Sequence, residues 1–150
     1  MAVALVAVCI VGGLVIARGK SNAEQTEQAA VVVDVAGKVA TDLASISANN
    51  AAQQLTVLTA ETTGQFHEQI APYAAALQST LAQAGANSKA QLTASGLESF
   101  ADDHATVLVA LSATVGNSAS PNVETVPYRL AIGLRKVNNR WLADEVSFIK

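Results

Sequence analysis

The sequence predicts an α+β protein, in which an N-terminal transmembrane helix precedes helices that pack on a four-stranded antiparallel sheet. Three observations predict this class. Residues 1–17 carry no charged or strongly polar side chain, apolar residues then recur at three- and four-residue steps, and from Lys89 onward the apolar spacing is two. We therefore expect an anchor over residues 1–20, an amphipathic helix leaving the membrane over 21–48, and an α+β domain over 49–150.

Composition supports one domain with a membrane segment. The 150 residues are 51% hydrophobic and only 14% charged, which supplies one core and an anchor but no second domain. Aromatic residues make up 4%, so a core of small and branched side chains favours tight packing over large pockets. The net charge is −3 and the nine basic residues form no dense stripe, which argues against nucleic-acid binding.

The apolar N-terminal run is the predicted anchor. At a rise of about 1.5 Å per residue, a helix over 1–17 approaches the thickness of a bilayer core. No basic residue precedes Arg18, so a retained anchor is favoured over a cleaved signal peptide, and the absence of a polar face disfavours a buried helix. Arg18 and Lys20 follow the run, and the positive-inside rule taken alone would keep the domain in the cytoplasm. Cys9 lies inside the run and is the chain's single cysteine, so it cannot form an intramolecular disulfide.

Helical spacing continues to about residue 84. The first soluble helix, over 21–46, has a stripe of apolar residues at helical steps: Val32, Val35, Val39, Leu43 and Ile46. Residues 47–50 interrupt it, and the side chain of Asn50 is expected to cap a short helix through Leu58. Thr62 and Gln65 have the capping-box spacing for a further helix. Its predicted buried stripe is Phe66, Ile70, Tyr73, Leu77 and Leu81, with a kink at Pro72.

Four strands are predicted after residues 85–88. The first alternates Leu92, Ala94 and Gly96 with polar residues and is expected to be half-buried, and Asp102 and Asp103 form the next turn. The second strand points its odd-numbered residues from Val107 to Val115 toward the helices. Residues 116–122 are expected to form a longer loop. The third strand directs alternate residues from Val126 to Leu134 inward, with Arg129 and Arg135 on the opposite face. Asn138 and Asn139 form a hairpin turn into a last strand over 140–149, anchored by Trp141.

Four features in this order resemble the Mce-associated membrane proteins. They are the anchor, Thr63-Gly64-Gln65-Phe66 at a helix start, the apolar strand over 105–111, and Asn139-Arg140-Trp141-Leu142 followed by Asp144. These proteins are accessory components of actinobacterial lipid-import systems, the mammalian-cell-entry complexes. The resemblance implies a curved sheet wrapped around helices, the cystatin-like roll, and a domain outside the cytoplasmic membrane. On orientation we follow the resemblance, because the opposing charge bias rests on two residues.

The titratable residues form no convincing catalytic set. The acid–base candidates are His67, His104, Asp102, Asp103, Asp144 and Tyr73. Three of them are adjacent in a predicted turn, where a solvated role is favoured. Two distant histidines and Cys9 do not make a metal site. We therefore expect no catalytic, cofactor-binding or metal-binding residues and no cofactor.

Positive charge gathers in the last two strands, at Arg129, Arg135, Lys136, Arg140 and Lys150. A partner protein or anionic lipid head groups could use such a patch, although a solvated sheet face is the favoured interpretation.

The expected function is that of a non-enzymatic, membrane-anchored accessory subunit that stabilises or modulates an Mce-type lipid-import complex. Its expected partners are subunits of that transporter and, through the anchor, membrane lipids. Its expected location is the cytoplasmic (inner) membrane, crossed once, with the domain on the extracytoplasmic side. The alternative is a roll domain that binds a lipid or small molecule. An enzyme of the isomerase or dehydratase type is a more distant alternative.

Overall fold

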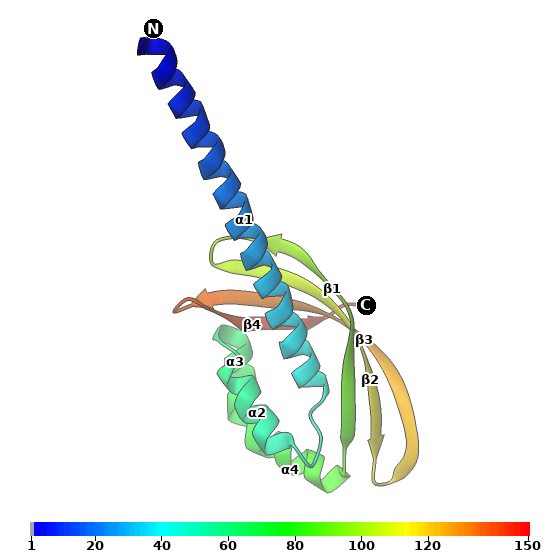
Figure 1. The fold of residues 1–150 in the computed structure, drawn as a ribbon. Helices are drawn as coiled ribbons and strands as arrows, with labels where there is room; N and C mark the ends of the chain where they lie inside the picture. The colour runs from blue at the N-terminus through cyan, green and yellow to red at the C-terminus, as the bar shows by residue number, and fades with distance from the viewer. Residues whose placement is uncertain (1) are drawn as a thin grey trace. The chain divides into compact units, whose positions relative to one another are not determined.

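A computed structural model describes the backbone of residues 2–150 and the side chains of 23–119 and 122–150. The helices are α1 (Ala2–Ala44), α2 (Ala51–Ala60), α3 (Gly64–Ile70), the 3₁₀ turn η1 (Ala71–Tyr73) and α4 (Ala74–Ala84). The strands are β1 (Asn87–Phe100), β2 (His104–Asn117), β3 (Ser120–Val137) and β4 (Arg140–Phe148). The chain divides into two compact units, Met1–Val31 and Val32–Lys150. The predicted α+β class and the order of helices before strands are confirmed (Figure 1).

Helix α1 covers the predicted amphipathic segment as far as Ala44. Of the predicted stripe, Val32, Val39 and Ile46 are buried, whereas Val35 and Leu43 are half-buried. Ala36 and Ala40, which the prediction did not name, are fully buried. Within the described residues, no helix is long and apolar enough to span a membrane. The side chains of residues 1–20, on which the predicted anchor depends, lie outside the described ones, so the anchor stays a prediction.

The two predicted helix caps are wrong. Asn50 is the N-cap residue of α2, but its side chain does not cap the helix, because Oδ1 accepts a hydrogen bond from the Ser47 N–H (2.7 Å) and the amide donates to the Ser45 carbonyl (3.2 Å). These bonds close the corner between α1 and α2 instead. Thr62 does not begin a capping box either, since its hydroxyl donates to the Thr59 carbonyl at the end of α2 (2.9 Å). A short polar side chain near a helix end has several backbone partners within reach, and spacing alone does not choose among them.

The predicted kink at Pro72 is confirmed as the 3₁₀ turn η1. The predicted stripe is confirmed only in part: Phe66 is buried and Ile70 and Leu81 pack half-buried against the core, but Tyr73 is 67% exposed and Leu77 is 40% exposed. A 3₁₀ turn has about 3.0 residues per turn instead of the 3.6 of an α-helix, so the apolar face does not continue straight across it. This rotation leaves Leu77 at the surface.

The sheet is a curved antiparallel meander in the order β1-β2-β3-β4, with helices against one of its faces (Figure 1). Its core side chains are as predicted: Val107, Val109, Leu111 and Ala113 of β2 and Leu130, Ile132 and Leu134 of β3 are at most 2% exposed. Trp141 is 7% exposed, and its ring centroid lies 5.9 Å from that of Phe100. Asn138 and Asn139 have φ of 49° and 63°, which confirms the predicted hairpin turn.

Two strand predictions are wrong. In β1, Leu92 pairs with Leu111 and Ala94 pairs with Ala110 of β2, so β1 advances by two residues while β2 advances by one. This extra residue after Leu92 is a β-bulge. The extra residue moves Ala94 and Gly96 to the face opposite Leu92, and most of β1 is exposed rather than half-buried. The predicted longer loop over 116–122 is absent, because β2 continues to Asn117 and β3 begins at Ser120.

Candidate functional site

The candidate site is an apolar groove of about 490 Å³ in the unit Val32–Lys150. Helices α3 and α4 contribute Phe66, Ile70, Leu77 and Leu81 to its lining, and strands β3 and β4 contribute Tyr128, Leu130, Val146 and Phe148. The lining also includes Leu43, Ala44, Ile46 and Ser88. Among the side chains that the structure describes, none that lines the groove is charged. Its volume lies in the range of small-molecule sites, about 300–1,000 Å³.

The local sequence of α4 explains why the groove is not filled. Between Ala74 and Ala84 the only large apolar side chains are Leu77 and Leu81, and five of the other residues are alanines. Alanine lacks the volume to reach the sheet, and η1 rotates Leu77 toward the surface. The groove therefore departs from the tight packing that the composition favours.

Two polar groups lie in the lining, and one of them already has a structural role. The Ser88 hydroxyl donates to the Ala44 carbonyl (2.5 Å), and the Ser88 N–H donates to the Ser47 hydroxyl oxygen (2.8 Å). These bonds fasten the end of α1 to β1. Among the described residues, the Tyr128 hydroxyl is the lining group without a hydrogen-bond partner. Its ring centroid lies 6.2 Å from that of Phe148, which is 71% exposed, so Tyr128 lies near the rim of the groove.

The structure does not bring the acid–base candidates together. His67 Nδ1 lies 3.0 Å from the Thr62 hydroxyl and 3.2 Å from the Thr59 carbonyl. Asp144 accepts a hydrogen bond from Arg135 Nε (3.1 Å). No hydrogen bond or ion pair joins His67 to Asp144 among the described residues, and Tyr73 is exposed outside the lining of the groove.

The remaining candidates lie in the β1–β2 turn. Asp103 Oδ1 accepts a hydrogen bond from His104 Nδ1 (2.8 Å), and this bond holds the pKa of Asp103 below its ordinary value. Both side chains are exposed, as is Asp102, so the turn is solvated. In the described part of the chain, no three His, Cys, Asp or Glu side chains are grouped closely enough to hold a metal ion.

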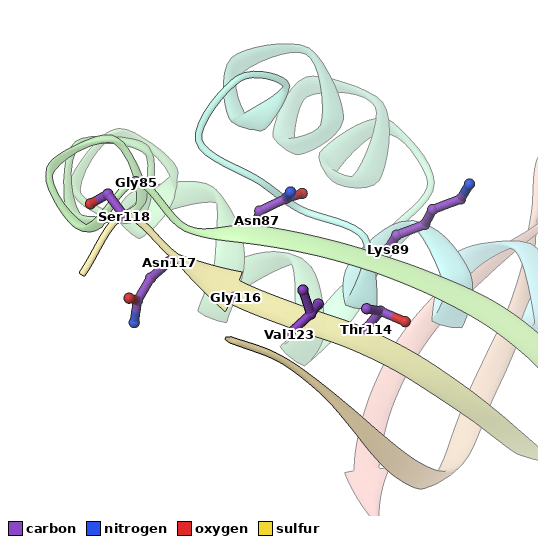
Figure 2. Close-up of a pocket in the computed structure, with 8 residues that line it drawn as sticks. All are labelled: Gly85, Asn87, Lys89, Thr114, Gly116, Asn117, Ser118 and Val123. Carbon is purple, nitrogen blue, oxygen red and sulfur yellow. The ribbon is translucent and has the colours of Figure 1, made fainter. Parts of the chain in front are cut away.

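A second hollow, of about 480 Å³, lies where α4 meets the β2–β3 turn (Figure 2). Its polar lining includes Asn87, Lys89, Thr114, Asn117 and Ser118. Figure 2 shows Asn87 and Lys89 on one side of the strands and Asn117 pointing to the other, so the polar groups do not converge. The Ser118 hydroxyl donates to the Ala84 carbonyl (3.0 Å) and holds α4 against the turn. We assign this hollow a structural role.

Sequence reasoning missed the apolar groove. The signal in the sequence was the alanine-rich stretch after Pro72, which leaves Leu77 and Leu81 as the only large apolar residues of that helix. Phe148, placed at the end of the last strand beyond Trp141, was a second signal. Neither shows by itself that the two segments face the same space.

A family model described as "Uncharacterized protein Rv1363c/MT1408-like" matches residues 1–150. The comparison with curated proteins finds no significant match.

Solved structures share the fold at low sequence identity. An IcmL-like type IV secretion system protein from Legionella pneumophila has a TM-score of 0.62 at 11% identity, covering 81% of this chain and 93% of that one. The periplasmic domain of DotI has a TM-score of 0.62 at 11% identity, covering 79% and 92%. The intermembrane space region of the chloroplast protein ARC6 has a TM-score of 0.57 at 17% identity, covering 82% and 95%. These likenesses concern the fold alone.

Proposed function

The chain belongs to the Rv1363c/MT1408-like family over its whole length, and we propose that it acts as a non-enzymatic, membrane-anchored accessory subunit of an Mce-type lipid-import complex. The observation that carries the proposal is the combination of two parts in one chain. An N-terminal run without charge precedes a domain whose fold occurs in a periplasmic domain and in an intermembrane space region. Both of those compartments are bounded by membranes.

In this proposal residues 1–20 cross the cytoplasmic membrane once and the α+β domain lies on its extracytoplasmic side. The anchor contacts membrane lipids and can also contact transporter subunits, because helices associate in lipid through close packing of small residues. The resemblance of the segments around Phe66 and Trp141 to Mce-associated proteins supports transporter subunits as the partners.

The placement of the titratable groups supports a non-enzymatic role. General acid–base catalysis needs a titratable group within hydrogen-bond reach of the reacting atom. His67, Asp144 and His104 have separate partners, and none of them lines the groove. Of the described residues that line the groove, Tyr128 alone would offer a titratable side chain to an isomerase or dehydratase mechanism.

Affinity purification tests the partner. The full chain, tagged after Lys150, is isolated from native membranes in a mild detergent, and the co-purifying proteins are identified by mass spectrometry. The proposal expects enrichment of Mce-type transporter subunits over an unrelated tagged membrane protein. A matched control replaces residues 1–20 with an unrelated membrane-spanning segment and separates contacts of the anchor from those of the domain. Equal recovery with the unrelated protein would count against the role.

The groove favours a second candidate function, the binding of a lipid or small molecule by the roll domain. A pocket of about 490 Å³ with an apolar lining is of the size and character that such ligands use. This candidate is compatible with an accessory role, because a subunit of a lipid-import complex can bind both a partner and a lipid.

A further inference from the structure

We propose that two copies of this chain associate through the free edge of strand β1, by antiparallel pairing of the segment Leu92–Leu97 about a twofold axis at Ser95. The free edge is the side of β1 that does not pair with β2. The proposal goes beyond the accessory role and does not depend on it. Failure of the purification experiment above would leave it standing, and a monomeric chain would leave the accessory role standing.

The two outer strands of the sheet are β1 and β4, and the chain itself pairs with β4. The Thr63 N–H donates to the Ala143 carbonyl (2.8 Å), and the Ala143 N–H donates to the Glu61 carbonyl (2.9 Å). The segment after α2 thus lies along β4. An uncovered sheet edge presents backbone N–H and C=O groups that can pair with another strand. We therefore looked for such groups along β1.

The beginning of β1 is covered by the corner between α1 and α2. The Ser88 N–H donates to the Ser47 hydroxyl oxygen (2.8 Å), and the Ala90 N–H donates to the Ser45 hydroxyl oxygen (3.0 Å). Both residues belong to the row of β1 that faces the core. Backbone N–H groups alternate in direction along a strand as side chains do, so the core-facing row directs its N–H groups to the free edge.

This row continues through Leu92, Ser95 and Leu97. Their partners in β2 are buried residues spaced two apart: Leu111, Val109 and Val107. In the part of the chain that the structure describes, no hydrogen bond from outside the sheet reaches these three residues of β1. The backbone groups from Leu92 to Leu97 are therefore available to an added strand.

The segment is complementary to a second copy of itself. Its spacing along β2 places Ser95 midway between Leu92 and Leu97. A twofold axis at Ser95, normal to the sheet, therefore sets Leu92 opposite Leu97 of the second copy on the core-facing side. The bulge makes this match possible, because without the extra residue the two leucines would lie on opposite faces. Leu92 is 47% exposed and Leu97 is 40% exposed, and the pairing would cover both.

The charges around the segment agree with antiparallel pairing of two copies. Lys89 lies before it and Glu98 after it, and residues 90–97 contain neither a charge nor a proline, the residues that keep natural edge strands apart. The antiparallel arrangement brings Lys89 of each copy toward Glu98 of the other. Among the described residues neither one is in an ion pair. Exposed charges of this kind favour one orientation and add little affinity.

Cross-linking at Ser95 tests the proposal with the full chain in detergent. Ser95→Cys is made together with Cys9→Ser, so that the chain holds one cysteine, and copper phenanthroline is the oxidant. Opposite residues of an antiparallel pair have Cα atoms about 5.5 Å apart, within the reach of a disulfide. We expect a disulfide-linked dimer on a non-reducing gel. Ser147→Cys, at an exposed serine of β4, is the matched control and should remain mostly monomeric.

A pair of leucine variants tests the edge itself. Leu97→Lys places a charge at the free edge twice in each dimer and is expected to raise the dissociation constant at least about tenfold. Leu108→Lys puts the same charge on the opposite face at 39% exposure, close to the 40% of Leu97, and should leave the constant unchanged. Sedimentation equilibrium in density-matched detergent measures both constants.

Circular dichroism checks that the variants fold, and cross-linking at Ser95 decides alone if Leu97→Lys does not. The proposal is overturned if the parent chain sediments as a monomer, or if Ser147→Cys cross-links as well as Ser95→Cys. It is also overturned if the two folded leucine variants dissociate alike.

Discussion

Lys38 links helix α1 to the end of α2. Its Nζ lies 2.8 Å from Asp42 Oδ2 and 2.5 Å from Glu61 Oε1, while Glu61 Oε2 is buried without a hydrogen-bond partner among the described residues. Burial lowers the pKa of Lys38, but the hydrogen bonds to Asp42 and Glu61 and the negative charges of these two carboxylates together raise it by more, so the net shift is upward from 10.5. The bond therefore stabilises the fold below pH 10.5, and the contribution is lost as the pH rises through the folded-state pKa.

Replacing Lys38 tests this link. Lys38→Met should lower the free energy of unfolding by about 1 kcal/mol at neutral pH, a modest value because the lysine is half exposed. The difference between parent and variant should shrink above pH 10.5. Urea unfolding of the full chain in detergent at pH 8 and at about pH 11 measures both effects. Lys89→Met, at an exposed lysine in β1, is the control, and a loss equal to that of Lys38→Met would refute the assigned role.

The Asp103–His104 contact gives a second prediction for single residues. The hydrogen bond from His104 lowers the pKa of Asp103, so His104→Ala should return that pKa toward its ordinary value. Carbon-13 NMR titration of the Asp103 side-chain carboxyl, in the parent chain and in His104→Ala, measures the change. An unchanged Asp103 titration would show that His104 is not the cause. Neither side chain is buried, so no loss of fold stability is expected.

The hydrogen-bond partners of single polar side chains were the least predictable feature of the chain. Asn50 and Thr62 have sequence contexts typical of helix caps, but each bonds to a different backbone group. Both choices depend on where Ser47 and Thr59 lie after the helices pack, which local spacing does not contain. Asn138 and Asn139 were predictable because their positive φ depends only on the turn itself.

At the scale of elements, Gly85 joins α4 to the sheet. Its φ is +57°, and a Cβ at this position would lie 2.7 Å from the Cβ of Ser118. A side chain here therefore meets both a disfavoured backbone conformation and a steric overlap.

Gly85→Ala should lower the free energy of unfolding by about 1–3 kcal/mol, with the backbone contributing about 1–2 kcal/mol. Chemical denaturation of the full chain in detergent measures the loss. Ser118→Gly removes the overlap but also the hydrogen bond to the Ala84 carbonyl, so Ser118→Gly alone is the reference. Gly85→Ala should cost less in that background than in the parent chain. Gly116→Ala is the control, because nothing lies within 4 Å of a Cβ there. Equal losses at the two glycines would contradict this explanation.

Most helices and strands could be predicted from the sequence, but the face on which some of their side chains lie could not. The alternation in β2 and β3 predicted which residues reach the core, because a period of two fixes the face of each side chain. The bulge after Leu92 reversed the faces of Ala94 and Gly96, and nothing in that local pattern signals an extra residue. Pro72 predicted the kink, but the exposure of Leu77 depended on how the 3₁₀ turn rotates the helix that follows.

At the scale of the whole molecule, the order of helices before strands was sufficient to predict the α+β class. The groove was not predictable, because it forms between α3, α4, β3 and β4, which only the tertiary fold brings together. The low aromatic content of the sequence favoured a tightly packed core over large pockets. Asp102, Asp103 and His104 lie at one turn, as their adjacency predicts, whereas His67 Nδ1 lies beside the Thr62 hydroxyl and the Thr59 carbonyl. The absence of a catalytic site stays a prediction.

The central claim is that the chain is anchored in the cytoplasmic membrane with its domain outside, and a topology reporter tests it most directly. Arg18 and Lys20 favour the opposite orientation, so the outcome separates the charge bias from the family resemblance. Two fusion proteins are made from the full chain. One has, after Lys150, a phosphatase that is active only outside the cytoplasm, and the other has, after Lys150, a fluorescent protein that matures only in the cytoplasm. The account predicts phosphatase activity in the membrane fraction without fluorescence. Fluorescence without phosphatase activity would contradict it.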